Sequence, residues 1–149
     1  MERVDELKHL DEGIIKTLND LSENEVQYWD LRISHGLGTN IDFTDKKSKE
    51  ISTHEITECG IRAFKNGGYG YCVFKDVNKE SIRESLLKAI KLAKFSERLT
   101  KEKFSLKLRD PLIEDFHVKS KKRIQDLGIE EKIDLVKYHE DVASEFSPE

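Results

Sequence analysis

Residues 59–74 read CGIRAFKNGGYGYCVF, and this stretch carries a strong signal for a tight turn between two β-strands. Asn66-Gly67-Gly68 supplies residues that accept a positive φ at little cost, as the favoured two-residue hairpin loops require. Beyond the turn, residues 69–73 alternate larger side chains with a glycine and a cysteine, at the spacing of an extended strand. The sequence therefore predicts a β-hairpin at this turn.

The same glycines admit a second interpretation, because Gly67-Gly68-x-Gly70 is similar in composition to a phosphate-binding loop. Such a loop places its backbone N–H groups at the N-terminus of a helix. Here a strand pattern follows the glycines instead of a helix pattern. We therefore favour the hairpin and expect no phosphate site.

Alternation continues on the N-terminal side of this turn. From Glu25 to His35, apolar Trp29, Leu31 and Ile33 share one face of an extended segment, and polar Asp30, Arg32 and Ser34 share the other. Gly36 and Gly38 interrupt the pattern, which Ile41 and Phe43 resume. After a polar turn at 45–49, two further strands are expected at about 49–53 and 55–64. The pattern predicts a meander of about five strands.

Three helices are expected around these strands. The first is an amphipathic helix whose apolar face recurs at three- and four-residue steps: Val4, Leu7, Leu10, Ile14, Leu18 and Leu21. The second begins after a good N-cap, Asn78, has Glu80 in its first turn and runs to about Phe95. Its predicted buried stripe is Ile82, Leu86, Ala89, Ile90 and Ala93. The third, about Ile129 to Glu145, is expected to bury Ile133 and Val136, with Leu135 and Val142 as further candidates.

These elements predict an α+β fold, an antiparallel meander sheet of four to six strands with helices packed on one face. We expect one domain over residues 1–149: a core over 1–97, a connector over 98–128 and a helix over 129–146 that leads toward a following domain. The connector is locally basic. A solvated linker is favoured for it, with a nucleic-acid-binding arm or a surface for another domain as alternatives.

Composition excludes several classes of function. The chain has 149 residues, 38% of them charged, and a formal net charge of −4, so general affinity for nucleic acid or acidic lipid is not expected. No apolar run approaches the ~20 residues that span a bilayer, and Met1 to Leu10 does not read as a secretory signal. Cys59 and Cys72 form no C-x-x-C pair, and two unpaired thiols favour a reducing compartment, the cytoplasm.

Five segments occur in an order that resembles the first domain of the TldD/PmbA family. They are Asp30-Leu31-Arg32, the glycines 36 and 38, the run from Cys59 to Phe64, the run from Asn66 to Tyr71, and the capped helix from Asn78 to Phe95. Glu130-Glu131-Lys132-Ile133, which opens a later helix, is also similar to that family. The order and spacing carry the resemblance, since no single segment is specific.

The resemblance implies a parent protein that is a zinc metallopeptidase working with a PmbA-type sibling to trim or mature peptides. In that family a His-Glu-x-x-x-His motif and a cysteine hold the zinc in a C-terminal domain, and this sequence is expected to end before them. It thus implies no catalytic, cofactor-binding or metal-binding residue in this chain. It also implies partners: a sibling subunit or self-association, and a peptide substrate in the full assembly.

His54-Glu55 looks like the start of a zinc-peptidase motif. A helical H-E-x-x-H sets two imidazoles one turn apart, with the Glu as base. Here Glu58 and Cys59 stand where the second His would be, and the segment reads as strand. We expect no metal at this place.

The other polar candidates have ordinary interpretations. His9 and His139 lie on charged helices and are expected to be solvated, and His35 and His117 have no visible partner in the sequence. Asp30 and Arg32 share one strand face and could form a local ion pair of little energetic value if exposed.

The sequence therefore predicts a domain without a complete catalytic site, inactive alone, whose function lies in a larger assembly. The favoured function is assembly and substrate enclosure in a TldD/PmbA-like metallopeptidase. The main alternative is a non-enzymatic PmbA-type partner or adaptor without metal. A nucleic-acid or gyrase-associated module is a third, which the acidic net charge disfavours.

Overall fold

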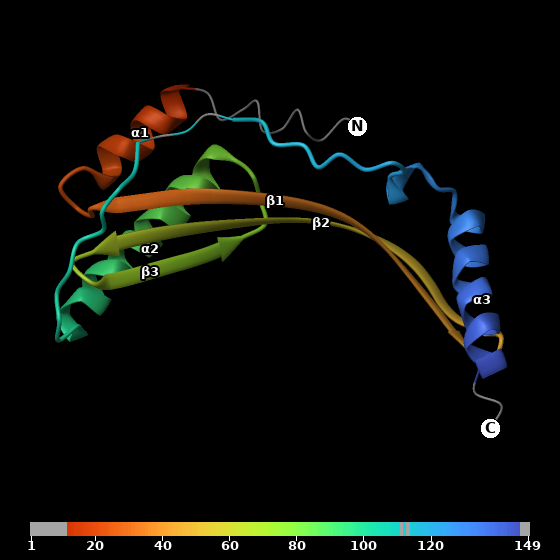
Figure 1. Cartoon of the computed structure of the whole chain (residues 1–149). Coiled ribbons are helices and arrows are strands. Elements are labelled where there is room, and N and C mark those ends of the chain that lie inside the picture. The colour runs from red at the N-terminus through yellow and green to blue at the C-terminus, as the bar shows by residue number, and fades with distance from the viewer. Residues whose placement is uncertain (1–11, 111, 113, 147–149) are drawn as a thin grey trace. The chain divides into compact units, whose positions relative to one another are not determined.

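The computed structural model describes residues 12–110, 112 and 114–146 (Figure 1). These residues form two compact units. The first unit comprises residues 12–36 and 56–109, and the second comprises residues 37–55 and the described residues from 110 to 146.

The sheet has three strands in the order β1-β2-β3: β1 is Tyr28–Thr44, β2 is Lys47–Lys65 and β3 is Gly68–Phe74. The α+β class and the antiparallel sheet are confirmed, but the prediction of four to six strands is wrong. β1 continues through Gly36 and Gly38, and β2 continues through residues 53–55, where breaks were expected. Glycine weakens a strand without ending it, since it can still make the ladder hydrogen bonds. Neither strand contains a proline.

Two short turns connect the strands. Asp45 and Lys46 join β1 to β2 with φ of 52° and 60°, and Asn66 and Gly67 join β2 to β3 with φ of 46° and 87°. Positive φ at both central residues suits the right-handed twist of the flanking strands. The predicted hairpin at Asn66-Gly67 is confirmed, with Lys65 opposite Gly68 in antiparallel register.

We expect Gly67→Val to lower the free energy of unfolding by about 1–3 kcal/mol. The backbone φ of 87° is unfavourable for a β-branched residue, and a Cβ would lie 2.9 Å from Thr100 Cγ2 and 3.1 Å from the Glu102 carbonyl oxygen. Denaturant unfolding measures the loss. Gly36→Val is the control, because a Cβ at Gly36 meets nothing within 4 Å. Saturable ATP or phosphate binding that Gly67→Val abolishes in an intact fold would instead revive the phosphate loop.

The first unit places two helices on one face of the sheet, α1 at Glu12–Ser22 and α2 at Lys79–Leu99 (Figure 1). The Asn78 Oδ1 accepts a 2.9 Å hydrogen bond from the Ser81 N–H, which confirms the predicted N-cap. All five residues of the predicted stripe of α2 are buried. In α1, Ile14 and Leu18 are buried, and the predicted helical residues Val4, Leu7 and Leu10 lie outside the described residues.

The core of this unit lies between the sheet and the two helices. Nine buried residues form it: Ile14, Leu18, Ile61, Ala63, Ile82, Leu86, Ala89, Ile90 and Ala93. Trp29 and Leu31 pack against this cluster, as predicted for that face of β1. On β3, Gly68 and Gly70 face α2 directly, since a Cβ at either position would overlap the backbone of the helix. These glycines let β3 and α2 approach closely.

The second unit contains the outer parts of β1 and β2, the short 3₁₀ helix η2 at Ile124–Asp126 and the helix α3 at Ile129–Phe146. The Lys46 N–H donates a 2.8 Å hydrogen bond to Glu140 Oε1, and Lys137 Nζ lies 5.8 Å from the centre of the Phe43 ring. The prediction that α3 buries its apolar face is wrong: none of its described residues is buried, and Ile133, Val136 and Val142 are half-buried. A two-stranded ribbon is too narrow to cover a helix face.

Candidate functional site

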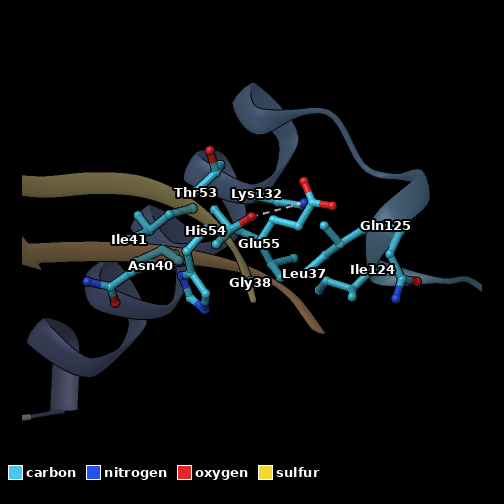
Figure 2. Close-up of a pocket in the computed structure, with 13 residues that line it drawn as sticks. Leu37, Gly38, Asn40, Ile41, Thr53, His54, Glu55, Ile124, Gln125 and Lys132 are labelled. Atoms are coloured by element: carbon cyan, nitrogen blue, oxygen red, sulfur yellow. Dashed lines mark hydrogen bonds between the residues drawn. The ribbon is translucent and has the colours of Figure 1, made fainter. Parts of the chain in front are cut away.

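An open groove of about 830 Å³ in the second unit is lined in part by His54 and Glu55, the pair that looks like the start of a zinc-peptidase motif (Figure 2). Its wall is mostly aliphatic, from Leu37, Ile41, Ile124, Leu135 and Val136. Lys132 on α3 crosses it and donates a 3.4 Å hydrogen bond to Thr39 Oγ1 on β1. The His54 ring lies directly over Gly38, where a Cβ would overlap the imidazole.

The residues around this motif do not fit a zinc site. His54 and Glu55 are neighbours on β2, so their side chains leave the strand on opposite faces. Residues 54 and 58 are four apart on a strand, a separation of roughly 13 Å, whereas zinc ligands lie about 2.0–2.3 Å from the metal. Burial also raises the pKa of the Cys59 thiol, which disfavours the thiolate that binds metal. Nor do the described residues elsewhere bring three potential ligands together.

The remaining histidines are distributed along the chain. His35 does have a partner, since its Nδ1 lies 3.1 Å from Thr57 Oγ1, so the expectation of an isolated side chain there is wrong. His139 on α3 is exposed and its ring contacts Tyr138 edge-on. His117 is exposed, and His9 lies outside the described residues.

The first unit presents a second candidate, the face of the sheet opposite α1 and α2. We call it the open face and define it by Asp30, Arg32, Ser34, Glu58, Gly60, Arg62, Tyr69, Tyr71 and Val73, which line a hollow of about 520 Å³ with the edge of Cys59. Tyr69, Tyr71 and Val73 come from β3 and are half or more exposed, at 50%, 50% and 57%. An exposed row of aromatic and aliphatic side chains beside arginine is typical of a binding surface.

An ion pair across β1 and β2 organises the middle of the open face. The Arg62 Nε donates to both carboxylate oxygens of Asp30 at 2.8 and 3.0 Å, and Arg62 Nη2 lies 2.6 Å from Oδ2. The expected pair between Asp30 and Arg32 is therefore replaced by one between strands. Neighbouring strands bring side chains within ~4.5–5.5 Å, closer than residues two apart on one strand.

The charge of Asp30 also changes the protonation of its neighbours. Its hydrogen bond and its charge both raise the pKa of the Arg62 guanidinium, which therefore stays cationic. Burial, followed by the hydrogen bond and charge of Asp30, raises the pKa of the Tyr28 phenol. Tyr28 therefore stays neutral at physiological pH.

The ring of Tyr71 lies against a glycine diagonally across the β2–β3 ladder. This glycine is Gly60, where a Cβ would come within 2.6 Å of the phenol oxygen. Tyr71 is also the register partner of Arg62 in the β2–β3 ladder. Sequence reasoning placed Asp30 on the polar face of its strand but missed its pairing with Arg62, because no local signal reports which residues of two strands meet.

None of the helices in the described part of the chain is long and apolar enough to cross a membrane. Together, the fold and the two surfaces define an α+β domain with an open, arginine- and tyrosine-bearing sheet face, whose described residues assemble no metal centre.

Comparison with known proteins relates part of this chain to a described protein family. Residues 29–94, which cover most of the sheet and nearly all of α2, match the family described as PmbA/TldA metallopeptidase domain 1. Over 109 residues, 73% of this chain, the sequence is 29% identical to a metalloprotease of Methanocaldococcus jannaschii and covers 24% of that protein. Residues 29–94 of this chain are therefore similar to the first domain of that metallopeptidase family.

A solved structure shares the fold. TldE from Thermococcus kodakarensis matches 91% of this chain with a TM-score of 0.61 at 16% identity, and the match covers 30% of that protein. A Thermotoga maritima protein described as a putative modulator of a DNA gyrase matches 85% of this chain with a TM-score of 0.48 at 19% identity, and the match covers 27% of its own chain. The chain thus spans less than a third of the length of each of these relatives.

Proposed function

We propose that this chain is the non-catalytic N-terminal domain of a TldD/PmbA-like metallopeptidase involved in peptide proteolysis or maturation, and that it contributes to assembly and substrate enclosure. The observation that carries this proposal is the family match over residues 29–94, which falls on the elements that form the open face. A domain that exposes tyrosine, valine and arginine side chains on one sheet face is suited to contact another protein surface.

Several finer expectations belong to this proposal. The zinc would be held outside this chain, and the partners would be a sibling subunit or a second copy, with a peptide as the substrate of the whole assembly. The whole of 1–149 would act as one domain, with a core over 1–97, a connector over 98–128 and a helix over 129–146. The two free cysteines, Cys59 and Cys72, favour a cytoplasmic location.

A non-enzymatic PmbA-type partner or adaptor is the alternative. The likeness to TldE supports the fold of such a subunit as well as that of a peptidase. A longer polypeptide containing this chain and a His-Glu-x-x-x-His motif would favour the peptidase parent.

The purified chain is expected to hydrolyse no peptide and to hold no stoichiometric zinc, because the residues near His54 cannot converge on one metal. Elemental analysis after dialysis against a weak chelator, together with a peptide-cleavage assay with and without added zinc, tests this. His54→Ala is the matched variant and should leave both readings unchanged. About one tightly held zinc per chain that this variant loses would overturn the proposal.

A further inference from the structure

The β2–β3 turn contains Asn66-Gly67, and Asn66 is the only asparagine of this chain that precedes a glycine. Asparagine is a chemically labile residue. The backbone nitrogen of the next residue can attack its carboxamide, and glycine obstructs this attack least because it has no Cβ. The asparagines that precede residues with a side chain are Asn19, Asn24, Asn40 and Asn78. Asn66 is therefore the position of this sequence most susceptible to deamidation.

Deamidation at this position needs no reagent other than water. The Gly67 nitrogen attacks Cγ of Asn66, so that a Cγ–N bond forms and the Cγ–Nδ2 bond breaks. Nδ2 leaves as ammonia with the proton of the Gly67 N–H, and a succinimide ring remains. Water then opens the ring at either carbonyl carbon. Attack at Cγ gives aspartate, whereas attack at the main-chain carbonyl gives isoaspartate, which has an additional methylene group in the backbone.

In the folded chain, the leaving group of this reaction is hydrogen-bonded to a carboxylate. Asn66 Nδ2 donates a 2.7 Å hydrogen bond to Glu97 Oε1 on α2, and the Asn66 N–H donates a 2.9 Å bond to Gln27 Oε1. Asn66 is half-buried, and the side chain of Glu97 is 16% exposed. The hydrogen bond from Asn66 is the main cause that lowers the pKa of the Glu97 carboxyl, which therefore stays ionised at neutral pH. A charged acceptor makes the hydrogen bond stronger than a neutral one would.

We propose that Asn66 is a site of spontaneous deamidation, that Glu97 protects it in the folded chain, and that its conversion releases the β2–β3 turn from α2. The hydrogen bond to Glu97 holds the carboxamide in one orientation and so lowers the population of conformers in which Cγ meets the Gly67 nitrogen. After conversion to aspartate, a carboxylate oxygen replaces Nδ2, so repulsion between like charges replaces the hydrogen bond at Glu97. Isoaspartate also lengthens the backbone of a two-residue turn, whose geometry depends on its length.

The modification also affects β3, because the contact between β3 and α2 begins at this turn. A Cβ at Gly68 would overlap the backbone of α2 at Glu97, so the start of β3 lies directly against the helix. Tyr69, the next residue of β3, lies on the open face. Repulsion between residue 66 and Glu97 therefore acts at the end of the strand that carries the tyrosines of the open face. This inference is independent of the proposed function, since it needs no partner and no catalytic domain.

The first test measures the rate of deamidation by peptide mapping and mass spectrometry during incubation of the folded chain at neutral pH. Glu97→Ala should raise the rate at Asn66 about tenfold, the factor that corresponds to one hydrogen bond to a charged group. Glu97→Gln should raise it less, because the Oε1 of the new amide still accepts the hydrogen bond. Lys103→Ala is the matched control and should leave the rate unchanged. Lys103 Nζ lies 3.6 Å from the same Glu97 oxygen, so this change removes a neighbouring charge and keeps the hydrogen bond.

Two references separate local protection from general unfolding. In concentrated urea, the unmodified chain and its variants should all deamidate at Asn66 at one common, faster rate, because the hydrogen bond is lost in each. Asn40 and Asn78 are internal references in the same peptide map, and Glu97→Ala should not accelerate their conversion. An unchanged rate at Asn66 in folded Glu97→Ala overturns the inference, as does a uniform acceleration at all three positions. Equal rates at Asn66 in the folded and the urea-unfolded chain also overturn it.

The second test measures what conversion does to the fold. Asn66→Asp reproduces the aspartate product and should lower the melting temperature by about 3 °C or more, because it places a second carboxylate against Glu97. Asn40→Asp is the control: it adds the same charge at an exposed residue of β1 and should leave the melting temperature unchanged. Asn66→Asp/Glu97→Gln should recover most of the loss, since an amide at position 97 can donate to the new carboxylate. An Asn66→Asp variant as stable as the unmodified chain would contradict the release of the turn from α2, as would a double variant that recovers nothing.

Discussion

Leu86→Ala should lower the free energy of unfolding by about 2–5 kcal/mol. Leu86 lies in the middle of α2 with no exposed surface and belongs to the cluster between the helices and the sheet. Truncation removes apolar contacts and leaves a cavity that its neighbours cannot close without moving. The expected loss of stability is the sum of two contributions: the transfer free energy of the removed atoms and the free-energy cost of the cavity.

Leu92→Ala is the matched control for this change. It is the same substitution on the same helix, but Leu92 is 48% exposed. Its expected cost is below about 1 kcal/mol, as for most surface changes. Urea unfolding of both variants, followed by Trp29 fluorescence, measures the difference, and equal losses would show that α2 is rotated relative to the orientation described above.

Gly70→Ala should be unusually costly for the addition of one methyl group, about 3 kcal/mol, the upper part of the range for overpacking. A Cβ at Gly70 would overlap the carbonyl group of Ala89 and lie 2.6 Å from the backbone nitrogen of Ala93. Backbone atoms in a helix cannot rotate away as the end of a flexible side chain can. The methyl group can therefore be accommodated only by moving β3 away from α2.

The control for this prediction is Gly36→Ala, because a Cβ at Gly36 meets nothing within 4 Å. That change should cost less than about 1 kcal/mol. Hydrogen exchange adds a second readout, since Gly70→Ala should speed exchange in β3 before it speeds exchange in the rest of the sheet. A Gly70→Ala variant as stable as the unmodified chain would refute the close approach of strand and helix.

The groove around His54 and the open face differ in the side chains that line them. The groove around His54 has a mostly aliphatic wall, and among the described residues no group of three potential metal ligands lies there. The open face has an ion pair between Asp30 and Arg62 and exposed tyrosine side chains from β3. These properties favour recognition of a protein surface over chemistry, in agreement with the proposed place of this domain in a larger assembly.

Local features of the chain were predictable from the sequence because each depends on a few adjacent residues. The Asn66-Gly67 turn follows from the low cost of positive φ in these residue types, and the Asn78 cap follows from a side chain that reaches its own helix. The buried stripe of α2 follows from helical periodicity. The family resemblance likewise rested on order and spacing along the chain, and the comparisons confirm it.

Only the tertiary structure decided how distant segments meet. Glycines 36 and 38 weaken β1 locally, but its hydrogen bonds to the neighbouring strand continue through them. The sheet therefore has two long strands and one short strand instead of about five short ones. The pairing of Asp30 with Arg62, and of His35 with Thr57, depends on which residues of two strands are neighbours. The apolar pattern of α3 predicts which face of the helix is apolar. Whether that face is buried depends on the width of the surface that it packs against. Periodicity along one segment specifies the direction of its side chains, and only the packing of a second segment specifies what they contact.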